Sequence, residues 1–453
     1  MDKIYLSSLG GSGENGRNCY LIEMTDGYVL LDCGVKREIV DGQVGFYPDL
    51  TDEIVSGIKA VFLSHCHEDH VAGLPLLYQM GYRGKVYGSR ETIKEALGFV
   101  KKWMGYVEKN HGALPFEPEM ADRIEFAALE DAAWKSASCA DCLTADTDNR
   151  INQGFRIPEI PDVQIMTGRS GHVLGGVWYI FTMKGKKILY TGDMCKDPAT
   201  LAWDCPSECD AAIMNAAYAG TQIDQKEQYQ KLLQAVKTCV ARSGKVMLPV
   251  PPKGRGIDIA MFLADNLPGA KLFVEDVVIK SMKELAGKHE WIKSGVLTHL
   301  PDNLSVITSE EERREALEYE GGAAYIAPDG MISTDLSLQY FEALKGDAAN
   351  HFIISGHAAK GTAGAGVLDE TWRKEHGVLA SGEKIVFKVH MDDGDIQALC
   401  RKVGLKQVML FHSDAPMTVR VKGLLKEDGV EAVTLLYPDK LEVRQKDSYD
   451  FCP

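Results

Sequence analysis

Four side chains able to bind a metal fall within residues 65–70, directly after the apolar run 59–63. The segment reads H-x-H-x-D-H. His65 and His67, two residues apart, can bind one cation. Asp69 and His70 can bind a second, because adjacent side chains point in different directions. Neutral imidazole and carboxylate suit zinc-like cations. We therefore predict a metal site here, the alternative being surface histidines near the start of a helix.

Three more residues have metal-site chemistry, and two of them follow short apolar runs. Asp32 ends the run 28–31, Asp193 follows the run 188–190, and His172 lies within a glycine-rich stretch. Each apolar run predicts a strand, so each side chain is expected at a strand end, where a rigid element would hold it. The glycines beside His172 and Asp193 permit tight turns and close backbone approach.

The second half of the chain alternates between helix and strand patterns from about residue 205. Apolar residues at helical spacing predict a helix at 225–241. Further helices are expected at 256–267 and, with many charged residues, at 309–320. Short apolar runs predict strands at 245–250, 271–279, 323–327 and 351–354. Such alternation indicates a parallel sheet with crossover helices.

Taken in order, these motifs resemble the metallo-β-lactamase superfamily, and the later ones its β-CASP nuclease branch. The segments that match the cap of that branch are 249–256, 327–331, 355–364, 388–392 and 410–414. The loop 10–18 is also similar to that of RNase J enzymes. The resemblance implies an α/β chain: an αββα sandwich with an inserted α/β β-CASP cap.

The expected boundaries follow from that resemblance. Residues 1–204 would form the first part of the sandwich, 205–378 the cap, and 379–453 the completing part of the sandwich. The weakly patterned segment 105–165 is expected to be an insertion. It contains a lone C-x-x-C at Cys139 and Cys142, which we interpret as ordinary free cysteines rather than half of a zinc site with Cys205 and Cys209.

The resemblance also implies roles for individual residues. The residues expected to bind the first metal are His65, His67 and His172. Those expected to bind the second are Asp69, His70, Asp193 and His412, with Asp193 bridging both ions. Asp32 would orient a ligand from behind, a task that such sites usually need. Besides Asp69 and Asp32, the catalytic set would include His390 as a general acid or a phosphate contact.

The implied reaction is hydrolysis of phosphodiester bonds in RNA or single-stranded nucleic acid by a metal-activated hydroxide. Two divalent ions would be needed, zinc or alternatively manganese. Lys253, Arg255 and Lys360, in glycine-rich cap loops, are candidate phosphate contacts; the alternative is solvated charges. Backbone N–H groups of the loop 10–18 could hold an anion, although a tight turn is an equally good interpretation.

One position departs from the family pattern. β-CASP nucleases carry a carboxylate in a Glu-Ser-Thr-Tyr-Gly-like element after the Asp193 strand, where this chain has Asn215. An amide could hold the His390 imidazole but could not stabilise its protonated form. Two other hypotheses therefore stay open: a hydrolase of a small phosphoester or ester, and a non-catalytic scaffold that keeps the fold.

The composition of the chain limits the classes of function and location that fit it. The 453 residues carry a formal net charge of −15, which argues against a broad basic face for nucleic acid. No apolar stretch is long enough to predict a membrane span. The first residues lack a secretory leader and the 11 cysteines are scattered, so we expect reduced thiols and a cytoplasmic protein. The sequence leaves open whether the chain forms a homodimer.

Overall fold

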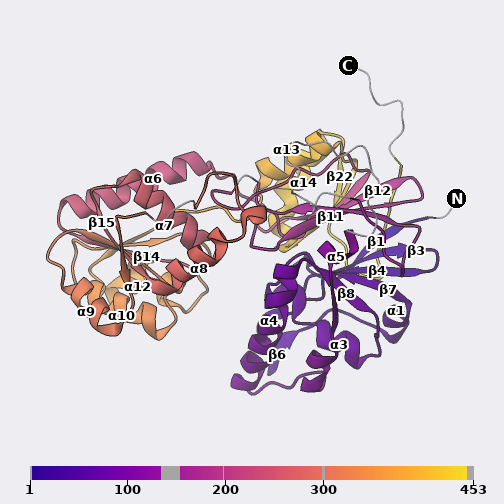
Figure 1. Cartoon of the computed structure of the whole chain (residues 1–453), viewed down its shortest axis with the longest axis horizontal. Coiled ribbons are helices and arrows are strands. Elements are labelled where there is room, and N and C mark those ends of the chain that lie inside the picture. The colour runs from indigo at the N-terminus through magenta and orange to yellow at the C-terminus, as the bar shows by residue number, and fades with distance from the viewer. Residues whose placement is uncertain (1–2, 134–153, 197, 298–300, 446–453) are drawn as a thin grey trace. The chain divides into compact units, whose positions relative to one another are not determined.

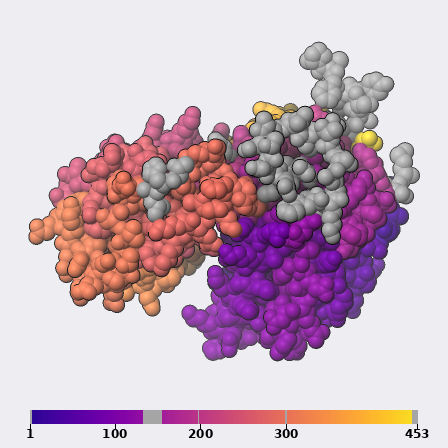
Figure 2. Space-filling model, in the orientation of Figure 1, coloured from indigo at the N-terminus to yellow at the C-terminus, as the bar shows by residue number. Residues whose placement is uncertain are grey.

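The computed structural model of the protein describes residues 3–133, 154–196, 198–297 and 301–445. The chain divides into two compact units (Figure 1). The sandwich unit comprises Met1–Asp197, Ala202–Gln222 and His390–Pro453, and the cap unit comprises Pro198–Leu201 and Ile223–Val389. Figure 2 shows the surface of each unit, with the cap unit in pink to orange and the sandwich unit mainly in indigo to magenta.

The first sheet of the sandwich unit has seven strands and carries its helices on one face. Its order is β23 (Leu441–Glu442), β1 (Tyr5–Gly10), β3 (Cys19–Met24), β4 (Gly27–Leu31), β7 (Ile58–Phe62), β8 (Lys85–Gly88) and β9 (Glu125–Ala128). The helices are α1 (Asp52–Gly57), α2 (Glu68–Val71), α3 (Leu74–Gln79), α4 (Arg90–Lys109) and α5 (Leu129–Ala133). Ile54, Leu77 and Ala96 from α1, α3 and α4 join the apolar cluster over the sheet.

The second sheet has six strands in the order β10 (Gln164–Arg169), β11 (Val177–Met183), β12 (Lys186–Tyr190), β13 (Ala211–Asn215), β20 (Gln407–Phe411) and β22 (Glu431–Val433). Its first three strands are antiparallel and the rest run parallel. Helices α13 (Asp393–Val403) and α14 (Val419–Glu427) pack on it through residues such as Leu399 and Leu425. Two small ribbons complete the unit: β5 (Lys36–Val40) with β6 (Gln43–Phe46), and β2 (Ser12–Gly13) with β21 (Ser413–Asp414).

Aromatic side chains fill the space between the two sheets. The Phe62 ring lies 5.4 Å from that of Tyr179 and 5.2 Å from that of Phe181, and the Tyr20 ring lies 4.8 Å from that of Phe411. Each pair joins one strand of the first sheet to one of the second. Helices outside and aromatic residues between the sheets confirm the predicted αββα sandwich.

The cap unit is an all-parallel six-stranded sheet flanked by helices (Figure 1). The strand order is β16 (Leu304–Ile307), β15 (Lys271–Glu275), β17 (Ala323–Ala327), β14 (Lys245–Pro249), β18 (His351–Ile354) and β19 (Ser381–Lys384). The helices are α6 (Gln225–Ala241), α7 (Arg255–Asn266), α8 (Asp276–Ala286), α9 (Glu310–Glu318), α10 (Asp335–Leu344), α11 (Ala363–Gly366) and α12 (Glu370–Glu375). The inserted α/β cap is thereby confirmed.

Three expectations differ from the structure in detail. Residues 211–215 form β13, which pairs with β12 and β20, so the sandwich continues past the expected boundary at 205. β19 pairs with β18, so the cap continues past 378. Residues 276–279, expected in a strand, begin α8, because a short apolar run is compatible with either element.

The described parts of the expected insertion at 105–165 include regular elements of the sandwich unit. The first part of this segment completes α4 and adds β9 to the edge of the first sheet, where β9 pairs with β8 in parallel. Cys139 and Cys142 lie outside the described residues.

Candidate metal centre

The H-x-H-x-D-H segment is held at the end of β7 by backbone hydrogen bonds to two other strand ends. The Cys33 N–H donates to the His70 carbonyl (2.8 Å) and the Asn18 N–H to the Asp69 carbonyl (2.9 Å). His67 precedes α2, and Asp69 and His70 lie within it. The turn from strand to helix therefore fixes these ligand candidates on rigid backbone.

The first donor group comprises His65, His67, His172 and Asp193, which are largely buried. Nδ1 of His67 lies 3.0 Å from Nε2 of His65 and 3.3 Å from Nε2 of His172. Oδ2 of Asp193 lies 3.6 Å from the His172 nitrogen and 3.8 Å from the His65 nitrogen. Ligands about 2.05 Å from a tetrahedral zinc would be separated by roughly 3.4 Å. The spacing of these atoms thus fits one small cation.

The second group comprises Asp69, His70 and His412. Oδ2 of Asp69 lies 2.8 Å from Nε2 of His412 and 3.6 Å from Nε2 of His70. The same His70 nitrogen lies 3.4 Å from Oδ1 of Asp193. The two oxygens of Asp193 therefore face the two groups separately. The structure brings together all seven residues expected to bind metal.

Asp32 supports this arrangement from behind. It is buried and has a positive φ of 57°, which turns its carboxylate into the site. Its Oδ2 accepts hydrogen bonds from Nδ1 of His70 (2.6 Å), from Oγ of Ser64 (2.6 Å) and from the Tyr190 hydroxyl. Because Nδ1 of His70 is used in this way, its Nε2 is directed toward Asp69 and Asp193.

The electrostatics differ between the two groups. Burial lowers the pKa of His65 far below its usual value and that of His67 to about 4, so both imidazoles are neutral and able to coordinate a metal. Burial opposes protonation of His70 and His412 as well, but nearby carboxylates, chiefly Asp193, raise the pKa of both. The negative charge of these carboxylates would equally attract a cation.

His390 lies over the first group but is not bonded to a carboxylate. Its Nδ1 is 3.8 Å from Oδ2 of Asp193 and is buried without a hydrogen-bond partner among the described residues. Its ring centroid lies 4.6 Å from that of His172 and 5.1 Å from that of Tyr218. Burial lowers the pKa of His390 well below its usual value. Asn215, expected to hold His390, instead donates from Nδ2 to Oδ1 of Asp193 (2.7 Å).

The sequence motifs predict no role for several residues that contact the site, Asn18 and Tyr190 among them. The Asn18 Nδ2 atom lies 3.1 Å from Oδ2 of Asp69 and 2.9 Å from Nε2 of His70. Tyr190 contacts Asp32, as described. Asn18 ends the loop 10–18, and Tyr190 lies in the strand before Asp193, so both stand in motifs that the sequence shows. Nothing in the sequence distinguishes these two side chains from residues that only pack.

The loop 10–18 holds an anion of its own. The Gly11 N–H donates to Oε1 of Glu14 (3.2 Å), and the same oxygen accepts from Nε of Arg17 (2.6 Å). The Gly11 carbonyl accepts from the His412 N–H (2.7 Å), which fixes this end of β20. In this structure the loop therefore positions His412, and its Gly11 N–H faces the Glu14 carboxylate.

The three candidate phosphate contacts all lie in the cap unit. Lys253 and Lys360 are exposed. Arg255 is half-buried, and its Nη1 donates to the Ser355 carbonyl (3.2 Å), which ties the start of α7 to the residue after β18. The structure thus gives Arg255 a structural contact that the sequence did not predict.

The sandwich and its donor set define a class of protein, and comparison with known families agrees. The chain belongs to the metallo-beta-lactamase superfamily, whose model matches residues 12–240. A Beta-Casp domain model matches residues 265–367. The His and Asp clusters, in a fold of this superfamily, are suited to a divalent metal. Among the described residues, none of the helices is both long and apolar enough to cross a membrane.

Several named relatives align with nearly the whole chain. Endoribonuclease YSH1 of Candida albicans is 24% identical over 92% of this chain and 49% of its own length. Transcription termination factor FttA of Methanocaldococcus jannaschii is 23% identical over 90% of this chain and 64% of its own length. Integrator complex subunit 11 of Gallus gallus is 24% identical over 94% of this chain and 72% of its own length. The chain thus spans about half to three quarters of the length of these relatives.

A solved structure shows the same fold. The crystal structure of a protein of unknown function from Enterococcus faecalis matches 97% of this chain and 100% of its own, with a TM-score of 0.58 and 13% identity. At this level of identity the match concerns the fold alone.

Proposed function

We propose that this protein is a metal-dependent hydrolase that cleaves phosphodiester bonds in RNA or single-stranded nucleic acid. One observation supports this above all others: two groups of buried imidazoles and carboxylates meet at Asp193, with one of its oxygens facing each group. Two divalent ions, zinc or manganese, would fit these groups. When bound, such ions make water more acidic and stabilise negative charge on a phosphoryl group.

The side chains of the site have distinct proposed tasks. His65, His67 and His172 would hold one ion through neutral nitrogens, and Asp69, His70 and His412 the other. Asp32 keeps Nε2 of His70 directed inward through its hydrogen bond to Nδ1. His390 would donate an N–H hydrogen bond to an oxygen of the scissile phosphate. Because it is buried and its Nδ1 has no hydrogen-bond partner among the described residues, we expect it to act as a neutral donor more than as a strong acid.

RNA as substrate class is supported by the relatives, one of which is named an endoribonuclease. The net charge of −15 predicts that affinity for RNA depends on a few local contacts. The logarithm of the binding constant should then fall only gently with the logarithm of salt concentration. Lys253 and Lys360 remain the proposed contacts. K253A and K360A should each reduce, by about one, the slope of the logarithm of the binding constant against the logarithm of salt concentration.

The decisive experiment compares wild type with D69A after chelation and reloading with zinc or manganese. Hydrolysis of labelled single-stranded RNA and of bis(p-nitrophenyl) phosphate should be lost in D69A and retained in D122A, whose aspartate is exposed in the same unit. Thermal unfolding would show that both variants fold. Cleavage of the small diester without cleavage of RNA would overturn the proposal that RNA is the substrate. Equal rates for D69A and wild type would overturn the mechanism.

A further inference from the structure

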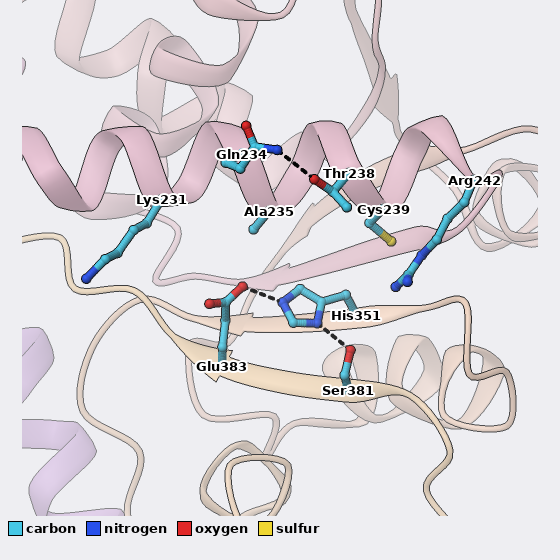
Figure 3. A pocket seen from close by; sticks show the side chains of 9 residues that line it. All are labelled: Lys231, Gln234, Ala235, Thr238, Cys239, Arg242, His351, Ser381 and Glu383. Atoms are coloured by element: carbon cyan, nitrogen blue, oxygen red, sulfur yellow. Dashed lines mark hydrogen bonds and ion pairs between the residues drawn. The ribbon is translucent and has the colours of Figure 1, made fainter.

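The cap unit contains an open pocket of about 350 Å³ between α6 and the edge strand β19 (Figure 3). One wall is a single face of α6, and the other is made by β18 and β19. The α6 wall includes Lys231, Thr238, Cys239 and Arg242, and the strands contribute His351, Ser381 and Glu383.

Three of the strand residues form a continuous hydrogen-bonded chain. Nδ1 of His351 lies 2.7 Å from Oγ of Ser381, and Nε2 of His351 lies 2.7 Å from Oε1 of Glu383. The register of the sheet explains this: His351 pairs directly with Ser381, and Glu383 lies two residues further along β19 on the same face. The imidazole is therefore placed between two side chains of the neighbouring strand.

The Glu383 carboxylate fixes the direction of one of these hydrogen bonds. An ionised carboxylate only accepts, so Nε2 of His351 carries a hydrogen, and in the neutral imidazole Nδ1 is then the acceptor for the Ser381 hydroxyl. The Asn350 carbonyl, 3.5 Å from Oγ of Ser381, is a second acceptor for that hydroxyl. A hydroxyl bonded to a base that is itself oriented by a carboxylate is the arrangement of an activated nucleophile. It is recognised by geometry and not by sequence position.

The surroundings suit an attack from the pocket. Ser381 is exposed, and the side chains of His351 and Glu383 are 12% and 43% exposed. Arg242, directly after α6, also lines the pocket, and in Figure 3 its side chain extends toward the strands. Cys239, the other potential nucleophile, is buried; burial raises its pKa and keeps it a thiol.

We propose that Ser381, His351 and Glu383 form a serine-type nucleophilic centre that accepts acyl groups from small carboxylic esters bound in this pocket. Oγ of Ser381 forms a bond to the acyl carbon as the ester C–O bond breaks. The hydroxyl proton passes to Nδ1 of His351 and then to the departing alkoxide. Water then attacks the acyl carbon by the same steps, which releases the carboxylic acid and restores the Ser381 hydroxyl. Glu383 is a positioning residue.

The test uses the 453-residue chain treated with a chelator, so that the proposed metal centre is silent. A fluorophosphonate probe should give one adduct per chain, located by mass spectrometry at Ser381, and p-nitrophenyl acetate should be hydrolysed. H351A should slow labelling by at least 100-fold, in the range typical of a lost general base. E383Q, which keeps a hydrogen-bond acceptor but loses the charge, should slow it about 10-fold.

Two controls decide the interpretation. S281A removes a half-buried cap serine, whose hydroxyl donates to the Val277 carbonyl of its own helix, and should label like wild type. Heat-unfolded protein should not label at Ser381. Labelling at other residues, absence of labelling at Ser381, or equal rates in the E383Q and wild-type proteins would overturn the proposal and leave these three residues as an inter-strand contact.

Discussion

Asn215 donates a hydrogen bond of 2.7 Å from Nδ2 to Oδ1 of Asp193, and both side chains are buried. Its amide orientation is defined, because Oδ1 of Asn215 accepts the Ala217 N–H at 3.3 Å. Asn215 therefore supports the carboxylate whose other oxygen faces His65 and His172. Motif matching linked position 215 to His390, whereas the structure links it to Asp193.

Substitution of Asn215 should change stability and metal response in different ways. In chelator-treated protein, N215A should lower the free energy of unfolding by about 1.5–3 kcal/mol, the value of a hydrogen bond to a charged group. N215D should lower it further, because two buried carboxylates within hydrogen-bond distance repel each other. Urea unfolding measures both. Added zinc should raise the free energy of unfolding of N215D more than that of N215A, because cations offset the extra negative charge. Equal increases in the two variants would contradict this.

The support of His70 by Asp32 predicts a loss of metal affinity when the carboxylate is replaced. In D32N, the new amide N–H₂ group would face at least one of the donors that now bond to Asp32, so His70 would lose its fixed orientation. We expect metal affinity to fall 10- to 100-fold. Y190F, which removes one donor and leaves the carboxylate, should have a smaller effect. Competition with a chromophoric chelator measures both, and equal affinities would show that Asp32 does not orient His70.

Gly34 allows the two strand ends of the site to approach each other. A Cβ atom at this position would lie 1.6 Å from the Asp69 carbonyl oxygen. G34A should therefore displace Asp69 and His70, reduce metal affinity and destabilise the fold by several kcal/mol. G98A is the matched control: it lies within α4 with open space around it and should stabilise the helix by about 0.5–1 kcal/mol. Chemical unfolding and metal titration of both variants test the prediction, which fails if G34A behaves like G98A.

The sequence was sufficient for the fold class and for the set of seven metal-site candidates, because each of the seven stands in a motif of the family that the chain resembles. It was not sufficient for contacts that depend on three-dimensional proximity. Asn18 reaches Asp69 and His70 across 51 and 52 positions of sequence separation. Asn215 bonds to Asp193 because β13 runs beside β12. Ser381 and His351 meet through strand register alone. Such pairings have no local pattern.

Asp258 in the cap unit predicts a pH-dependent stability that is independent of the metal centre. Burial raises its pKa from 3.8 to about 6, although Thr200, which donates a hydrogen bond to it, and Lys293 partly offset this. Between pH 3.8 and about 6 the folded chain retains a proton that the unfolded chain has lost, so stability falls as pH rises through this window and stays lower above it. Ionisation of the buried Asp258 therefore lowers the free energy of unfolding at neutral pH by about 1–3 kcal/mol.

D258N should remove that cost, because a neutral amide can still accept the Thr200 hydrogen bond. Loss of a negative charge from the first turn of α7 opposes the gain by about 0.3–1 kcal/mol, so we expect net stabilisation near pH 7 and a flatter profile between pH 4 and 6. D265N, an exposed aspartate of the same helix, should leave the shape of the profile unchanged. Urea unfolding from pH 4 to 8 measures all three proteins. If the D258N curve runs parallel to that of wild type, Asp258 is ionised in the folded protein throughout this range.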